Sequence, residues 1–160
     1  MNMPHTFTVT LGADAIFVSH TAYKTHNFGI YFIKCDEEIV RVGESQSSYT
    51  RIIKGFKNPF RKFIRGKDRK HYMAYPWRTY YPHAILSVDF FELKDPYFKD
   101  NSLRRSLEAE LTFQLRLYYK KWPIRMCEIH FSEATRTDTL IVTTASEILA
   151  HYKIPYAKEV

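Results

Sequence analysis

Tyr31, Arg41 and Arg51 follow one another at intervals of ten residues and offer groups that suit a phosphate. A planar guanidinium can contact two phosphate oxygens, and a phenolic hydroxyl can donate or accept a hydrogen bond. Arg51 lies about 200° from Tyr49 on a helical wheel, away from the apolar stripe of that segment, so it is not a core residue. The spacing therefore raises the question of a site for an anionic substrate.

A strongly basic segment begins at the third of these residues. Residues 51–71 hold nine basic side chains and one acidic one, so this segment carries +8 while the whole chain carries +7. Such a run is costly to bury and attracts a polyanion. Aromatic side chains between 72 and 81 suit contacts with bases or sugars. A solvated loop on a basic protein is the alternative. The predicted nucleic-acid-binding residues are Lys54, Lys57, Arg61, Lys62, Arg65, Lys67, Arg69 and Lys70.

Glu110 is an anomaly in the clearest helical pattern of the chain, residues 102–121. The leucines of this segment fall in one arc of the helical wheel, and Glu110 falls inside that arc. A buried carboxylate is costly without a partner, so Glu110 needs a cation, a hydrogen-bond donor or a metal ion. Glu108 lies at the edge of the arc and reaches water more easily. On geometry alone, a structural ion pair and a metal site fit Glu110 equally well.

The elements that must position these residues come in an α/β order. Aromatic and β-branched side chains on both faces of 28–35 predict a strand covered on both sides, and alternation at 39–42 predicts its antiparallel partner. Ser47 or Ser48 can cap the helix that would carry Arg51. Further strands are expected at 6–11 and 84–93, an extended piece at 128–131, and a final helix at 145–152.

This order of motifs resembles the GIY-YIG nuclease family over residues 28–123. The chain has GIY at 29–31, RVG at 41–43 and then Arg51. The sequence SLEAELTFQ at 106–114 is similar to the family's helix, in which a small-Leu pair precedes the metal-binding Glu by three residues; in that register the ligand is Glu110. The resemblance implies an α+β fold with a small three-stranded antiparallel sheet flanked by helices. The remaining elements add an N-terminal accessory strand and a C-terminal extension.

The resemblance also implies a reaction, the hydrolysis of nucleic-acid phosphodiesters with one Mg²⁺ or Mn²⁺ ion. Tyr31 would be the general base or would orient the attacking water, and Arg51 would contact the scissile phosphate. Glu110 would bind the metal through oxygen. Gly29 and Gly43 would let backbone approach closely within the sheet.

The chain departs from the family pattern at three places. Arg41 replaces the tyrosine of the second motif and cannot act as a base at neutral pH. We expect it to contact phosphate or to favour proton loss from Tyr31, if the two share a face of the hairpin. Gly55 stands where family members often have a histidine; His71 is a candidate substitute, with an ordinary surface histidine as the alternative. The basic insert at 54–82 is longer than the family core needs and is expected to bind the substrate.

Length and composition indicate one domain over residues 1–160. No apolar run approaches the roughly 18 residues that span a bilayer, and the N-terminus lacks a secretory layout. The two cysteines, Cys35 and Cys127, form no CxxC motif and suggest neither a zinc site nor a disulfide framework. We therefore expect a cytoplasmic protein with no membrane partner.

Two functions of different classes follow. The first is a metal-dependent DNA endonuclease of the restriction or mobile-element kind, with Tyr31, Arg41, Arg51 and Glu110 as its site and His71 as a further candidate. The second is a catalytically inactive nucleic-acid-binding module with the same fold. Alternatively, Tyr31 is an ordinary aromatic residue of a strand, and Arg41 and Arg51 are ordinary surface arginines. No residue distinguishes DNA from RNA, and the oligomeric state is open, although a double-strand cut by one small site would call for a dimer.

Overall fold

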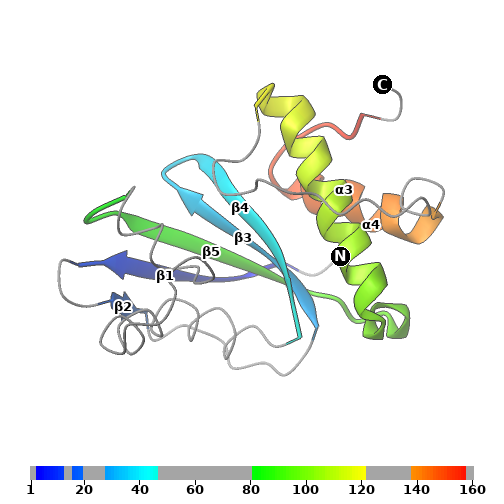
Figure 1. Ribbon diagram of the computed structural model, residues 1–160, viewed down its shortest axis with the longest axis horizontal. Helices are drawn as coiled ribbons and strands as arrows, with labels where there is room; N and C mark the ends of the chain where they lie inside the picture. The colour runs from blue at the N-terminus through cyan, green and yellow to red at the C-terminus, as the bar shows by residue number, and fades with distance from the viewer. Residues whose placement is uncertain (1–2, 13–15, 20–27, 47–80, 122–137, 158–160) are drawn as a thin grey trace, which may run out of the picture.

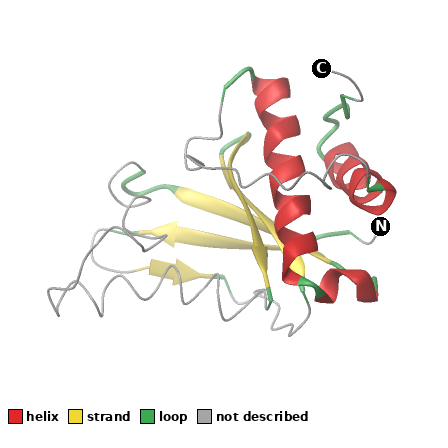
Figure 2. Cartoon of the chain, turned by 45° about the vertical axis from the view of Figure 1, so that its right-hand side comes forward, coloured by secondary structure: helices red, strands yellow, loops and turns green. Residues whose placement is uncertain are grey.

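The computed structural model describes residues 3–12, 16–19, 28–46, 81–121 and 138–157. These residues form an α+β fold in which one antiparallel sheet carries two helices at one of its ends (Figures 1 and 2). Within this part of the chain, no helix is long and apolar enough to cross a membrane.

The sheet has five strands in the order β2-β1-β5-β3-β4. They are β1 (His5–Leu11), β2 (Ile16–Val18), β3 (Gly29–Cys35), β4 (Glu38–Ser45) and β5 (Ile85–Glu92). The three strands expected for the core, β4, β3 and β5, are neighbours. The sheet is therefore larger than the three strands expected, because β1 pairs with β5 and β2 pairs with β1.

The sheet buries apolar side chains on both faces. The helix face, named for the helices packed against it, includes Ile30, Phe32 and Phe91. The tyrosine face, on the opposite side, includes Tyr31 and Phe90. Successive side chains of a strand point to opposite faces, so a strand buried on both sides must be apolar throughout. The first five residues of β3 are all buried, as the sequence predicted.

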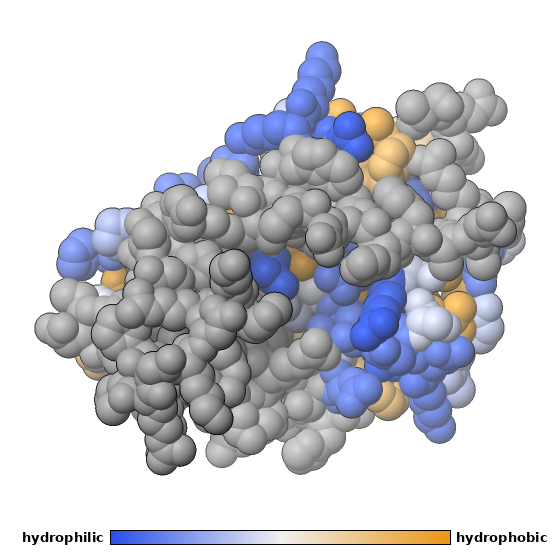
Figure 3. Space-filling model, viewed as in Figure 1, coloured by the Kyte–Doolittle hydropathy of each residue, from blue (hydrophilic) through white to orange (hydrophobic). Residues whose placement is uncertain are grey.

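Two helices and one short turn follow β5. The 3-10 helix η2 (Pro96–Lys99) leads into α3 (Asn101–Tyr119), and α4 is Thr139–His151. Asp100 caps α3 by accepting a hydrogen bond from the amide of Ser102 at 2.7 Å. Hydrophilic side chains gather over the first turns of α3 on the face seen in Figure 3, while its leucines pack on the helix face. This division is the amphipathic pattern that the sequence showed for residues 102–121.

The final helix was expected at 145–152 but begins at Thr139. Its first turns are rich in β-branched residues, which have a low helix propensity. Asp138 offsets this by accepting hydrogen bonds from the amides of Leu140 and Ile141 at 2.9 and 3.3 Å. The expected helix around Arg51 and the extended piece at 128–131 lie outside the described residues.

Asp89 joins α4 to the sheet from a buried position on β5. Its carboxylate accepts hydrogen bonds from the hydroxyls of Thr6 and Tyr152 at 2.7 and 2.8 Å and lies 2.7 Å from Nζ of Lys34. Burial and the neighbouring carboxylate raise the pKa of Tyr152 above its usual value, so its hydroxyl stays protonated and donates. Three donors from three elements thus stabilise one buried carboxylate.

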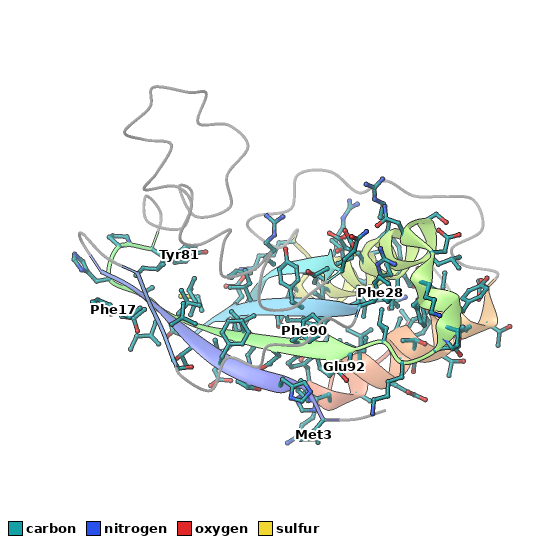
Figure 4. All side chains as sticks on the ribbon, turned by 90° about the horizontal axis from the view of Figure 1, so that it is seen from below. Met3, Phe17, Phe28, Tyr81, Phe90 and Glu92 are labelled. Carbon is teal, nitrogen blue, oxygen red and sulfur yellow. The ribbon has the colours of Figure 1, made fainter. Side chains whose placement is uncertain are left out.

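Arg104 joins α3 to the edge strand β4. Its side chain is fully buried, and its Nε lies 3.2 Å from Oε2 of the buried Glu44. The guanidinium also lies 4.6 Å from the ring centroid of Phe28, which Figure 4 shows near the helices. Three further N–H groups donate to the carbonyl oxygens of Phe98 and Lys99 and to Oδ1 of Asn101. The orientation of α3 on the sheet is therefore fixed by a buried cation with hydrogen bonds from four of its five N–H groups.

Arg104→Ala is expected to lower the free energy of unfolding by about 3–5 kcal/mol, because it leaves the Glu44 carboxylate buried without its cation. Urea denaturation followed by circular dichroism measures the change. Arg105→Ala is the matched control, since Arg105 is the exposed neighbour on the same helix. Its loss should change stability by no more than about 0.5 kcal/mol. Equal denaturation midpoints for the two variants would contradict the role given to Arg104.

Candidate active site

Tyr31 lies in the middle of β3, with β4 on one side and β5 on the other. Its neighbours across the sheet are Gly43 on β4 and Phe90 on β5. The tyrosine is 4% exposed, and its ring lies directly over Gly43. A Cβ atom at position 43 would come within 2.3 Å of both Cζ and the hydroxyl oxygen of Tyr31. Gly43 was expected to allow a close approach of backbone, but the group that approaches is the side-chain ring of Tyr31.

Arg41 lies on the same face as Tyr31. Residues paired across antiparallel strands share a face, and Arg41 pairs with Ile33, two residues after Tyr31. Tyr31 and Arg41 are therefore diagonal neighbours rather than direct partners, at a separation that long side chains can bridge. The two residues do not pair directly across the hairpin, but the shared face on which an effect of Arg41 on Tyr31 was conditional is present.

The Nε atom of Arg41 is buried and, among the described residues, has no hydrogen-bond partner. A buried donor left unpaired costs about 1–3 kcal/mol, so such groups are rare and call for a specific explanation. An acceptor supplied by a bound anion, such as a phosphate oxygen, would satisfy this donor. The tyrosine face thus has, within the described residues, a cationic donor without a partner on the residue diagonally opposite Tyr31.

Helix α3 closes the outer edge of β4 with side-chain hydrogen bonds. Oε2 of Glu108 accepts a hydrogen bond from the amide of Glu44 at 3.2 Å. Near the other end of the strand, the Tyr119 hydroxyl bonds the backbone of Ile39, and burial raises the pKa of this tyrosine. Unpaired edge amides promote aggregation unless they are covered. The helix therefore protects the strand that carries Arg41 and Gly43.

Glu110 is 1% exposed, as its position inside the apolar arc predicted. Its Oε1 accepts hydrogen bonds from the Tyr156 hydroxyl at 2.7 Å and from Nε2 of Gln114 at 2.9 Å. Gln114 also bonds both the carbonyl oxygen and the amide of Ala157, at 3.0 and 2.9 Å. We call these four residues the C-terminal clasp, because they hold the end of the described chain against α3.

The surroundings of Glu110 do not fit a divalent cation. Its Oε2 is buried and has no hydrogen-bond partner within the described part of the chain, so one ligand atom is available. Mg²⁺ requires about six oxygen ligands in near-octahedral geometry and usually keeps several waters. Among the described residues, no group of three or more His, Cys, Asp and Glu side chains could hold a metal ion. The sequence predicted that Glu110 needs a cation, a hydrogen-bond donor or a metal ion as a partner. In the structure its partners are hydrogen-bond donors.

The structure thus brings together part of the predicted site. Tyr31 and Arg41 share a face, while the hydrogen bonds of Glu110 go to α3 and to the C-terminal segment. Arg51, His71 and all the predicted nucleic-acid-binding residues from Lys54 to Lys70 lie outside the described residues, as does the insert at 54–82 as far as residue 80.

Sequence reasoning missed Arg104, which is fully buried and is the most deeply buried charged residue in the described part of the chain. On the helical wheel Arg104 lies about 100° from Leu103, inside the arc that singled out Glu110. The same criterion would therefore have found both residues. No comparable signal marked Glu44, because charged residues alternate with apolar ones in any half-exposed strand.

Comparison of the chain with models of protein families, with curated proteins and with solved structures finds no match.

Gly43→Ala is expected to destabilise the protein by about 1–3 kcal/mol, because the added methyl group would overlap the Tyr31 ring. The same substitution in a Tyr31→Ala background should cost at least about 1 kcal/mol less, since the overlapping ring is gone. Urea denaturation of the wild type, the two single variants and the double variant completes this cycle. Additive effects would show that the ring does not lie over Gly43.

Proposed function

We propose that the protein is an endonuclease that hydrolyses DNA phosphodiester bonds, with its site on the tyrosine face of the sheet and with Mg²⁺ or Mn²⁺ as cofactor. The proposal is carried by the buried Nε of Arg41, which has no hydrogen-bond partner among the residues that the structure describes and lies on the same face as Tyr31. The Arg41 Nε can donate a hydrogen bond to an oxygen of a phosphodiester, and the Tyr31 hydroxyl can accept or donate a proton.

The proposed chemistry is an in-line attack of water on the phosphorus atom. The water must lose a proton, and the developing charge on the phosphoryl oxygens must be stabilised. Tyr31 would accept or direct the proton of the water, while Arg41 and Arg51 would bind the phosphoryl oxygens. Arg41 thus takes an electrostatic role where the family pattern has a tyrosine.

A divalent cation would add charge stabilisation and a more acidic water. The family pattern assigns its ligand to Glu110, whose closed surroundings do not fit an ion. The requirement for Mg²⁺ or Mn²⁺ therefore rests on the resemblance of the motifs.

The basic insert is proposed to bind the substrate. Its net charge of +8 between residues 51 and 71 suits a nucleic acid backbone. Such binding weakens steeply with salt because each contact releases condensed counterions. DNA is the proposed substrate, RNA fits the same charges, and a double-strand cut would require two copies of the chain.

The second candidate is a nucleic-acid-binding module of the same architecture without nuclease activity. Two observations favour it: Arg41 stands in place of a tyrosine, and the C-terminal clasp occupies Glu110. A buried Tyr31 is also what a core aromatic would show. The two candidates differ in whether bound DNA is cut.

Tyr31→Phe is expected to reduce nicking of supercoiled plasmid in Mg²⁺ or Mn²⁺ by about 10²- to 10⁴-fold, because it removes the hydroxyl and keeps the ring. Gel electrophoresis of plasmid incubated with the purified chain measures the rate. Tyr118→Phe is the matched control, since Tyr118 is 49% exposed on α3 and should be neutral.

Absence of nicking by the wild-type chain, together with salt-dependent DNA binding, would reject the nuclease and support the binding module. Equal nicking by wild type and Tyr31→Phe would keep the nuclease but remove Tyr31 from its site.

A further inference from the structure

Strand β2 is the outer strand of the sheet on the side opposite β4 (Figure 1). The outer edge of β4 is covered by α3, through Glu108 and Tyr119. By contrast, among the residues that the structure describes, no strand pairs with the outer edge of β2. An unpaired edge of this kind is a template for a further strand, so β2 is a candidate interaction surface.

The hydrogen bonds between β1 and β2 show which backbone groups of β2 face outward. The amide of Ser19 donates to the carbonyl oxygen of Thr8 at 3.0 Å, and the amide of Thr8 donates to the Ser19 hydroxyl at 3.1 Å. Hydrogen-bonded and non-hydrogen-bonded pairs alternate along an antiparallel ladder. Phe17, two positions before Ser19, therefore also directs its backbone groups to β1. The amides and carbonyl groups of Ile16 and Val18 point away from β1, to the open edge.

This edge is complementary to itself about Phe17. In an antiparallel pairing of two copies centred on Phe17, Ile16 of each copy lies opposite Val18 of the other. Each of these pairs can exchange both of its hydrogen bonds, which satisfies all the outward backbone groups of the two residues. The two Phe17 side chains meet in the non-hydrogen-bonded pair at the centre, where the side chains of paired strands approach most closely.

An exposed apolar row crosses the sheet and ends at this edge. Phe17 pairs with Thr10 on β1, and Thr10 pairs with Ile85 on β5, so the three side chains share one face. Phe17 is 65% exposed and Ile85 is 63% exposed. Figure 4 shows Phe17 at the end of the sheet away from the helices. Pairing of two copies at β2 would continue this row from one sheet into the other and take apolar surface out of water.

The distribution of charge favours a second copy as the partner. The net charge of +7 opposes self-association of the chain as a whole. Residues 1–23, however, contain only one Asp, Glu, Lys or Arg side chain, Asp14. The strands β1 and β2 contain none of the lysines or prolines that commonly protect a sheet edge from pairing. Two copies can therefore pair at β2 without bringing like charges of these strands together.

We propose that β2 is the interface of a homodimer, in which the β2 strands of two copies pair antiparallel about Phe17 and join their five-stranded sheets into one. The inference goes beyond the proposed function and is tested independently of it, because self-association is measured in the absence of DNA. Such a dimer would supply the two copies that a double-strand cut requires.

Sedimentation equilibrium of the full chain at a series of concentrations tests this proposal. The wild type is expected to approach twice the monomer mass of 19.1 kDa. Phe17→Lys places like charges opposite each other at the centre of the pairing. Val18→Pro removes an outward amide that makes no hydrogen bond to β1. Each substitution should weaken dimerisation by about tenfold or more, with an unfolding temperature close to that of the wild type.

Met3→Lys is the matched control, because Met3 is 76% exposed and precedes the end of β1 that does not pair with β2. It adds the same charge as Phe17→Lys and should leave the dimer unchanged. A wild type that stays monomeric at every concentration overturns the inference, whether or not it binds another protein. A dimer that both Phe17→Lys and Val18→Pro leave intact has its interface elsewhere and also overturns the inference.

Discussion

The buried ion pair between Arg104 and Glu44 fixes the position of α3 against the sheet, and the candidate site depends on that position. β4 is an edge strand, and an edge strand needs cover for its free amides. Arg104 brings α3 against this edge and donates four hydrogen bonds, to Asn101 at the helix start, to two carbonyl oxygens of η2 and to Glu44. With α3 held in this position, Glu108 faces strand β4 and Glu110 faces the C-terminal segment.

The tyrosine face depends on a second constraint, the absence of a side chain at position 43. Because β3 is central and covered on both faces, the Tyr31 ring can lie over β4 only where the partner residue has no Cβ. Gly29 is constrained in a similar way by the Phe90 ring and a β5 carbonyl oxygen. The two glycines are therefore explained by packing, and the same packing places the Tyr31 hydroxyl near the edge that α3 covers.

The sequence alone predicted those strands and the helix whose apolar residues recur with a strong period. The burial of β3 and of the leucine stripe of α3 could be predicted from the order of their apolar residues, and Glu110 was correctly expected to be buried. The β-branched start of α4 was missed because an aspartate cap and tertiary packing override low helix propensity there. The three-residue strand β2 is too short for any period to show.

The site was harder to predict because its geometry depends on contacts distant in sequence. The helical wheel found that Glu110 needed a partner, but it could not choose between an ion and the hydroxyl of Tyr156, 46 residues later. Similarly, no local pattern shows that Glu108 meets an amide 64 residues earlier. Long-range pairings of this kind determine how accessible each carboxylate is.

The most direct test of the account is a crystal structure of the protein bound to a short DNA duplex. We predict a phosphate oxygen at hydrogen-bond distance from Nε of Arg41, on the face of the sheet that also carries Tyr31. A duplex bound with no phosphate at Arg41 would contradict the proposed site.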